Sequence, residues 1–251
     1  MDSGLTYGRL DSPAFIWTLS ISTDVDAVNI ENGAGMKKTR KARGARPYHH
    51  GDLRRSLIDA ALALVTEKQD WTFSLREITR RAGVSHNAPY NHFTDGDELL
   101  IAVAAAGFER MRDHLRTAVS GIAAPDKALL ACGRAYIELA LKNPALYRLI
   151  CGPALAKSTG SRPAEARRAA DEARAVLEEI IQRGAQSGVF AVSPDDPLEQ
   201  AKVVFFAWSV VHGLSMALLD GFAETEITLD DLVKEIERVV LTGLRPGKSR
   251  R

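Results

Sequence analysis

Apolar residues recur at intervals of three and four along most of the chain, which is the period of an α-helix that buries one face. Residues that start or stop helices, such as Pro125, the Asn143-Pro144 pair and Gly188, separate these stretches. The pattern predicts helices over residues 51–68, 75–82, 85–92, 95–111, 126–142, 144–151, 164–186, 198–219 and 229–241. Since no stretch shows the alternation of a strand, the sequence predicts an all-α protein.

Residues 73–100 read FSLREITRRAGVSHNAPYNHFTDGDELL and have the pattern of a helix-turn-helix. The first helix should end at Gly83, because glycine favours the left-handed conformation that follows a helix. Ser85 is a good N-cap for the second helix. Pro89 should shorten or kink this second helix, because proline has no amide proton to donate. The second helix of such a motif enters the major groove of DNA.

Charge is distributed unevenly along the chain. Residues 36–92 hold twelve Lys/Arg against five Asp/Glu, whereas the whole chain has a formal net charge of +1. A basic patch confined to the helix-turn-helix end is typical of a DNA-binding module. Residues 37–46, with six Lys/Arg, are expected to form a flexible basic arm that follows phosphates or reaches a minor groove. A tail that only improves solubility is the open alternative.

The motif at about 74–93, with Tyr90, His92 and Phe93 where its second helix would end, resembles the amino-terminal domain of the TetR/AcrR family of transcriptional regulators. The resemblance implies a three-helix DNA-binding domain followed by a helical bundle that binds a ligand and dimerises. It also implies that Tyr90 and His92 contact the phosphate backbone. Family members often carry a lysine where this chain has Gly96, so one phosphate contact is expected to be missing.

The side chains of the second helix are the candidates for reading DNA. Asparagine can bond the edge of adenine twice, and an alanine methyl can touch the methyl group of thymine. Phosphate contacts set the register of a protein on DNA without reading its sequence. The expected base contacts are His86, Asn87 and Ala88, with Ser85 and Asn91 as further candidates, and the expected backbone contacts are Ser74, Tyr90 and His92.

A second motif, WSVVHGL, lies in the long apolar stretch near the carboxyl terminus. With its flanks it resembles the WHG-type carboxy-terminal domain of one branch of TetR-like regulators. Trp208 and His212 are four residues apart, so they share one helix face, and Phe205 lies one turn earlier. Such a face suits a ligand pocket, but a core tryptophan and a histidine bonded to a backbone carbonyl fit the pattern equally. The candidate ligand-binding residues are Phe205, Trp208, His212, Tyr136, Tyr147 and Cys151.

No set of residues in the sequence indicates catalysis, a metal site or a cofactor. Cys132 and Cys151 fit no zinc or redox spacing, and we expect them to be buried or half-buried in a reducing, cytoplasmic setting. The uncharged run at 203–219 is short for a membrane span and contains polar residues, so we expect it to be buried between the body and a second subunit. The sequence predicts neither an enzyme nor a membrane protein.

Five segments are expected along the chain. They are an upstream extension or misassigned start at 1–35, the basic arm at 36–48, the DNA-binding domain at 49–111, the ligand-binding and dimerisation domain at 112–245, and a tail at 246–251. The last two long helices should pair with their symmetry mates. The expected interface residues are Leu232, Val233, Ile236 and Val240.

These observations predict a homodimeric, ligand-responsive transcriptional regulator, a repressor by the usual mode of the family. It would bind a palindromic operator in double-stranded DNA through the helix at 85–92. A small-molecule effector, whose identity the sequence does not specify, would bind the carboxy-terminal domain and release the operator. The alternative is a helical small-molecule-binding protein or enzyme with a vestigial DNA-binding head.

Overall fold

The computed structural model describes residues 50–71, 73–152, 163–222 and 227–245, and within these ranges the chain contains helices, turns and loops but no strand. The prediction of an all-α protein is confirmed. The helices are α1 (His50–Lys68), α2 (Leu75–Ala82), the 3-10 turn η2 (Pro89–Asn91), α3 (Gly96–Val119), α4 (Pro125–Lys142), α5 (Pro144–Cys151), α7 (Ala164–Gln186), α8 (Pro197–Leu219), α9 (Leu229–Ile236), the π-helical turn η3 (Glu237–Leu241) and α10 (Thr242–Leu244). The expected amino-terminal extension, basic arm and carboxy-terminal tail lie outside the described residues.

Local signals in the sequence explain where these helices begin and end. The Ser74 hydroxyl accepts a hydrogen bond from the amide of Glu77, and the Glu77 carboxylate accepts one from the amide of Ser74, which closes a capping box on α2. Gly83 ends α2 with a φ of 67°. Asp95 caps α3 by accepting from the amide of Glu98 at 2.8 Å. Proline occupies the first position of α4, α5 and α8.

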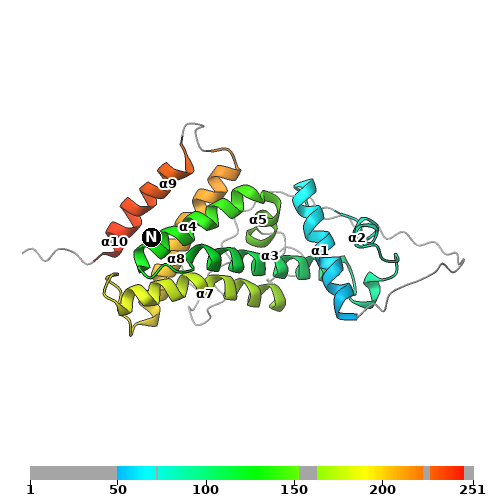
Figure 1. Cartoon of the computed structure of the whole chain (residues 1–251), viewed down its shortest axis with the longest axis horizontal. Coiled ribbons are helices and arrows are strands. Elements are labelled where there is room, and N and C mark those ends of the chain that lie inside the picture. The colour runs from blue at the N-terminus through cyan, green and yellow to red at the C-terminus, as the bar shows by residue number, and fades with distance from the viewer. Residues whose placement is uncertain (1–49, 72, 153–162, 223–226, 246–251) are drawn as a thin grey trace, which may run out of the picture.

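The molecule consists of a small head and a larger helical body (Figure 1). Helices α1 and α2 and the start of α3 form the head at one end of the molecule, α4, α5 and α7 pack against the rest of α3, and α8 and α9 pack against α4. Helix α3 makes its most extensive contact with α7. One continuous helix therefore connects the head to the body.

The head has a small apolar core. Leu57 of α1, Ile78 of α2 and Phe93, which follows η2, are all buried in it. Trp71 and Phe73 are partly buried and pack against this core. Because these residues come from four separate segments, the core fixes α2 and the turn after it relative to α3.

Arg54 forms a side-chain link between the head and the body. The Nη2 atom of Arg54 in α1 donates to Oε1 of Glu165, in the first turn of α7, at 3.0 Å. The same guanidinium lies over the ring of Phe93 at 5.4 Å from the ring centre, in a cation–π contact. Arg54 therefore ties the start of α7 to the core of the head.

Helix α8 is more apolar than its burial in this chain explains. Of the helices in the described ranges, it alone is long and apolar enough to cross a membrane, and only 22% of its most apolar window is buried. One face of α8 packs against α4 and α7. Phe206, on another face, is 54% exposed.

The carboxy-terminal helix differs from the sequence prediction in two respects. It continues past 241 to Leu244, and a π-helical turn interrupts it at Glu237–Leu241. Two residues that we had assigned to a dimer interface, Ile236 and Val240, are already buried against the body of their own chain. The apolar stripe identified a buried face correctly, but this part of it packs within the protomer.

Candidate nucleic-acid interface and ligand pocket

The second element of the helix-turn-helix is not an α-helix. The amide of Ala88 donates to the carbonyl of Ser85 at 3.0 Å, and the amide of His92 donates to the carbonyl of Pro89 at 2.8 Å, so these bonds span three residues instead of four. Only Pro89–Asn91 forms a 3-10 turn. Pro89 has no amide proton and its ring crowds the preceding turn. The sequence predicted a short or kinked helix at 85–92. In the structure, the segment that contains Pro89 forms no α-helix at all.

The turn at 85–92 exposes most of its polar side chains. Ser85, His86, Asn87, Tyr90 and Asn91 are exposed. The rings of His86 and Tyr90 meet edge to face with their centres 6.4 Å apart, which holds both side chains on one side of the turn. These residues present exposed polar groups that a nucleic acid could contact.

Three other residues that were expected to contact DNA are buried, half-buried or already hydrogen-bonded. Ala88 is only 8% exposed, so its methyl group cannot reach a thymine, and its assignment to base reading was wrong. His92 is half-buried, and its Nε2 has no hydrogen-bond partner among the described residues. Ser74 is exposed, but its hydroxyl takes part in the capping box of α2. Its amide is bonded there too, so Ser74 has little capacity left for a phosphate.

Two arginines beside this surface were missed by the sequence analysis. Arg76 and Arg80 of α2 are exposed, and neither forms an ion pair within the described part of the chain. Arg81, their neighbour, instead forms a two-pronged pair with Glu67 of α1. Both free guanidiniums are available to phosphates. The signal was present in the outward face of α2, but periodicity alone does not separate a paired arginine from a free one.

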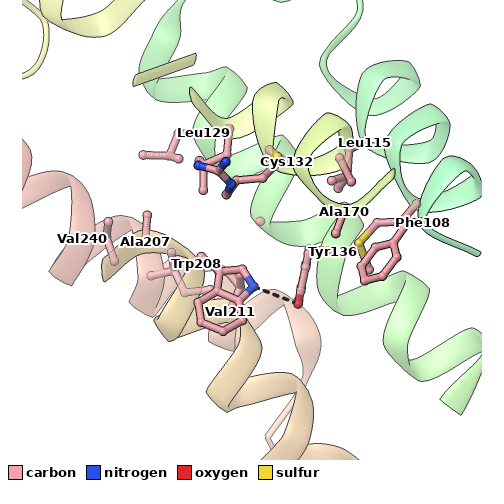
Figure 2. Close-up of a pocket in the computed structure, with 16 residues that line it drawn as sticks. Phe108, Leu115, Leu129, Cys132, Tyr136, Ala170, Ala207, Trp208, Val211 and Val240 are labelled. Carbon is pink, nitrogen blue, oxygen red and sulfur yellow. Dashed lines mark hydrogen bonds between the residues drawn. The ribbon is translucent and has the colours of Figure 1, made fainter. Parts of the chain in front are cut away.

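The body contains a cavity of about 60 Å³ between α3, α4, α7, α8 and the last helix (Figure 2). Its wall is almost entirely apolar and includes Phe108 of α3, Leu129 of α4, Val211 of α8 and Val240 of η3. The sequence predicted helices with apolar faces over these positions. It did not distinguish the wall of a cavity from a filled core, because both have the same apolar period.

The six residues proposed for ligand binding lie close together. Trp208 Nε1 donates to the hydroxyl of Tyr136 at 3.2 Å, and the hydroxyl of Tyr147 lies 2.7 Å from Nδ1 of His212. Tyr147 also donates to Tyr136 at 3.2 Å, and Cys151 Sγ lies 3.7 Å from the Tyr136 hydroxyl. We call these five side chains the tyrosine–histidine cluster. Phe205 packs on Trp208 with ring centres 6.0 Å apart.

Within this group, only Tyr136 and Trp208 line the cavity, and Figure 2 shows the hydrogen bond between them. Trp208 and His212 stack with their ring centres 4.6 Å apart and their planes 16° apart, as their spacing predicted. His212 bonds a tyrosine hydroxyl, not the backbone carbonyl that was the alternative. Tyr147, His212 and Cys151 therefore support the cavity wall from behind.

Burial keeps this region uncharged at neutral pH. Removal from water raises the pKa of Tyr136 and Tyr147 well above the usual value, so both hydroxyls keep their protons. The same effect raises the pKa of the Cys132 thiol to about 12 and lowers the pKa of His212 to about 4. The cluster is thus a network of neutral hydrogen-bonding groups.

The lowered pKa of His212 makes stability depend on pH. The unfolded chain takes up this proton near pH 6.5, while the folded chain takes it up only near pH 4, so acid favours the unfolded state. We expect His212→Asn, which keeps an acceptor near Nδ1, to remove a loss of about 2 kcal/mol between pH 7.5 and pH 5. Urea unfolding of both proteins at the two pH values measures this difference. Equal losses would show that His212 is protonated in the folded protein.

The carboxy-terminal part of the chain matches a known family. Residues 129–239 match the model described as "Tetracyclin repressor-like, C-terminal domain". The solved structure of a protein of unknown function from Rhodococcus sp. RHA1 is similar over 80% of this chain and 100% of its own, with 27% identity and a TM-score of 0.67.

Solved structures of other regulators share the fold. A TetR family transcription regulator from Marinobacter aquaeolei VT8 is 18% identical over 77% of this chain and 96% of its own, with a TM-score of 0.56. A regulatory protein in the TetR family from Rhodococcus RHA1 is 18% identical over 78% of this chain and 98% of its own, with a TM-score of 0.53. Residues 129–239 therefore form a tetracyclin repressor-like C-terminal domain, and the described chain has the fold of the TetR family transcription regulators to which it is similar.

Proposed function

We propose that the protein is a homodimeric repressor that binds a palindromic operator and is released from it by a small molecule. The observation that carries this proposal is the path of α3. Early in the helix, Leu99 and Val103 are buried near the head. Later in the helix, Phe108, Met111 and Leu115 line the cavity. A molecule that fills the cavity therefore presses on the helix that positions the head.

A ligand changes DNA affinity only if it binds the DNA-competent and DNA-free states with different free energies. Two elements can provide this difference, because both α3 and α7 border the cavity and both reach the head. Helix α7 reaches it through the bond between Arg54 and Glu165. Separation of α3 and α7 around a bound molecule would shift the head and change its spacing from the symmetry-related head.

The turn at 85–92 supports a division of DNA contacts. Asn87 and His86 are exposed and carry the donors and acceptors that base edges require, so we assign them to base reading, with Asn91 as a further base contact. Tyr90, Arg76 and Arg80 flank them, and we assign these to phosphates. We keep His92 and Ser74 as weaker contacts to the DNA backbone, because His92 is half-buried and the Ser74 hydroxyl is already hydrogen-bonded to Glu77.

Selection of bound fragments from random double-stranded DNA tests the proposal directly. We expect a palindromic sequence, since a symmetric dimer presents two identical heads. Addition of salt should weaken binding steeply, because the basic head releases counterions from DNA. Failure to retain any DNA at low salt would favour the alternative, a ligand-binding protein with a vestigial head.

Two substitutions in the turn should have different effects on the selected operator. Asn87→Ala should relax the preference at one base pair of each half-site, at a cost of about 1–3 kcal/mol. Tyr90→Phe keeps the ring against His86 and removes only the hydroxyl, so it should weaken operator and random DNA equally. Competition assays with single-base operator variants measure both effects. A uniform loss in both variants would contradict our division into base and phosphate contacts.

The proposed dimer forms through α8 and the last helix. Exposed apolar side chains remain on both, namely Leu198 and Phe206 on α8 and Val239 on η3. Exposed apolar faces of this kind mark interaction sites. Leu232 and Val233 are half-buried and stay in the proposed interface, whereas Ile236 and Val240 are removed from it. A second copy of α8 would cover the apolar surface that this chain leaves open.

A further inference from the structure

Arg174 of α7 is the one charged side chain among the described residues that line the cavity. Its side chain is only 13% exposed. Nη2 donates to Oδ1 of Asp171 at 3.2 Å, and Nη1 donates to Oε1 of Glu178. These carboxylates lie three residues before and four residues after Arg174 on the same helix, so they share its face and hold the guanidinium in place.

The third nitrogen of this guanidinium has no protein partner. Arg174 Nε is buried and forms no hydrogen bond within the described part of the chain. A buried N–H group without an acceptor is costly, so an unbonded one calls for an explanation. The other strong donors at the cavity are occupied, because Trp208 Nε1 donates to Tyr136 and the Tyr136 hydroxyl belongs to the tyrosine–histidine cluster. Arg174 Nε is the donor that remains for a bound molecule.

The two carboxylates determine which charge a molecule bonded to Arg174 Nε can carry. The guanidinium and the carboxylates of Asp171 and Glu178 together have a formal net charge of −1. An anionic molecule at Nε would lie close to two carboxylates that already neutralise the arginine. A cationic molecule would meet the guanidinium itself. A neutral acceptor avoids both penalties, and a charged donor still strengthens its hydrogen bond.

The size and the wall of the cavity limit the molecule further. A water-sized sphere needs at least about 10–15 Å³, so a cavity of about 60 Å³ holds only a few such spheres. The wall offers mostly aliphatic and aromatic carbon to the rest of the molecule. Larger ligands require α3 and α7 to separate.

We propose that the effector is a small, uncharged, mostly apolar molecule whose hydrogen-bond acceptor, such as a ketone or ester carbonyl oxygen, bonds Arg174 Nε. This inference rests on the proposed function, since it names the chemical class of the molecule that the regulator senses. It excludes free carboxylates and amines as the preferred effectors.

The test uses three probes of equal heavy-atom count, namely cyclopentanone, methylcyclopentane and isobutyrate, and the full-length protein labelled with ¹⁵N-arginine. The Nε–H resonance of Arg174, assigned by its loss in Arg174→Lys, reports contact with each probe directly. We expect cyclopentanone to shift this resonance and to bind roughly tenfold more tightly than methylcyclopentane, as a hydrogen bond to a charged group implies. Isobutyrate should bind most weakly.

Two variants provide matched controls. Arg174→Lys keeps a positive charge for Asp171 and Glu178 but has no Nε–H, so cyclopentanone affinity should fall to the level of methylcyclopentane while methylcyclopentane affinity stays unchanged. Glu178→Gln removes one of the repelling carboxylates, so isobutyrate should gain affinity while cyclopentanone does not. This second variant keeps the arginine, so it remains informative if Arg174→Lys does not fold.

Several outcomes would overturn the inference. These are equal binding of cyclopentanone and methylcyclopentane, strongest binding of isobutyrate, or a cavity that takes up water only. Release of the selected operator is measured separately. Selective binding of cyclopentanone without any change in DNA affinity would contradict the proposed ligand response and leave the inference intact. Operator release by probes that bind with no preference for a hydrogen-bond acceptor would support the proposed ligand response and contradict the inference.

Discussion

Phe206→Glu is expected to abolish high-affinity operator binding while leaving each protomer folded. Phe206 is 54% exposed on α8, so a charged side chain there disturbs little within its own chain. In a two-fold interface the substitution occurs twice and places two unpaired carboxylates in an apolar contact. A monomer engages only one half-site. Operator affinity should therefore fall by roughly 100-fold or more, because half of the base contacts are lost.

Phe206→Leu is the matched control, because it keeps the position apolar and should remain dimeric with nearly unchanged operator affinity. Analytical ultracentrifugation gives the oligomeric state, and gel-shift titration gives the affinity. Ile236→Asp is a poorer test, because Ile236 is buried in its own chain and the substitution would unfold the body as well. A Phe206→Glu protein that is still a dimer would place the interface on another face.

Phe190→Ala is expected to cause a large loss of folding stability. Phe190 follows α7 and is 2% exposed, and its ring lies directly over Gly184. A Cβ atom at Gly184 would lie 1.9 Å from Cδ2 of this ring, so the glycine is required by the ring. Removal of the ring leaves a cavity and should cost about 3–5 kcal/mol. Urea unfolding followed by circular dichroism measures it.

The close approach of Gly184 and Phe190 allows a double-mutant cycle. Gly184→Ala alone should destabilise the protein by about 1–3 kcal/mol, because the ring has no room to move in a filled core. In the Phe190→Ala background the same substitution should stabilise α7, by up to about 1 kcal/mol, since alanine favours helix more than glycine. If Gly184→Ala has the same effect in both backgrounds, the two residues are not in contact.

Most helix starts and several helix ends were predictable because they depend on neighbours in the sequence, although α3 continues to Val119, well past its predicted end at residue 111. Asp95 caps α3, and Gly83 ends α2 in the left-handed conformation. The same reasoning failed at 85–92, where Pro89 was recognised but Ser85 was still expected to start a helix. A single proline in so short a segment leaves no full turn to propagate, so the segment forms a 3-10 turn instead.

The candidate sites were less predictable, because they depend on contacts between distant segments. The spacing of Trp208 and His212 gave their shared face, but nothing local indicates that the hydroxyls of Tyr136 and Tyr147 meet them. Arg174 lies in a charged stretch of sequence, and only the packing of distant helices around the cavity makes it a mostly buried wall residue. Apolar stripes such as that of Ile236 indicate burial without indicating which chain supplies the contact.

The π-helical turn η3 has a consequence for how two effector molecules would bind. Val240 lines the cavity, and Val239, its neighbour in the chain, is 49% exposed on the face that we assign to the dimer. Any displacement of Val240 by a ligand also displaces Val239, because the backbone joins them. In the proposed dimer, occupancy of one subunit would thus alter the surface against which its partner packs. Effector titrations of the dimer should then be sigmoidal or biphasic, with a Hill coefficient different from that of the Phe206→Glu monomer.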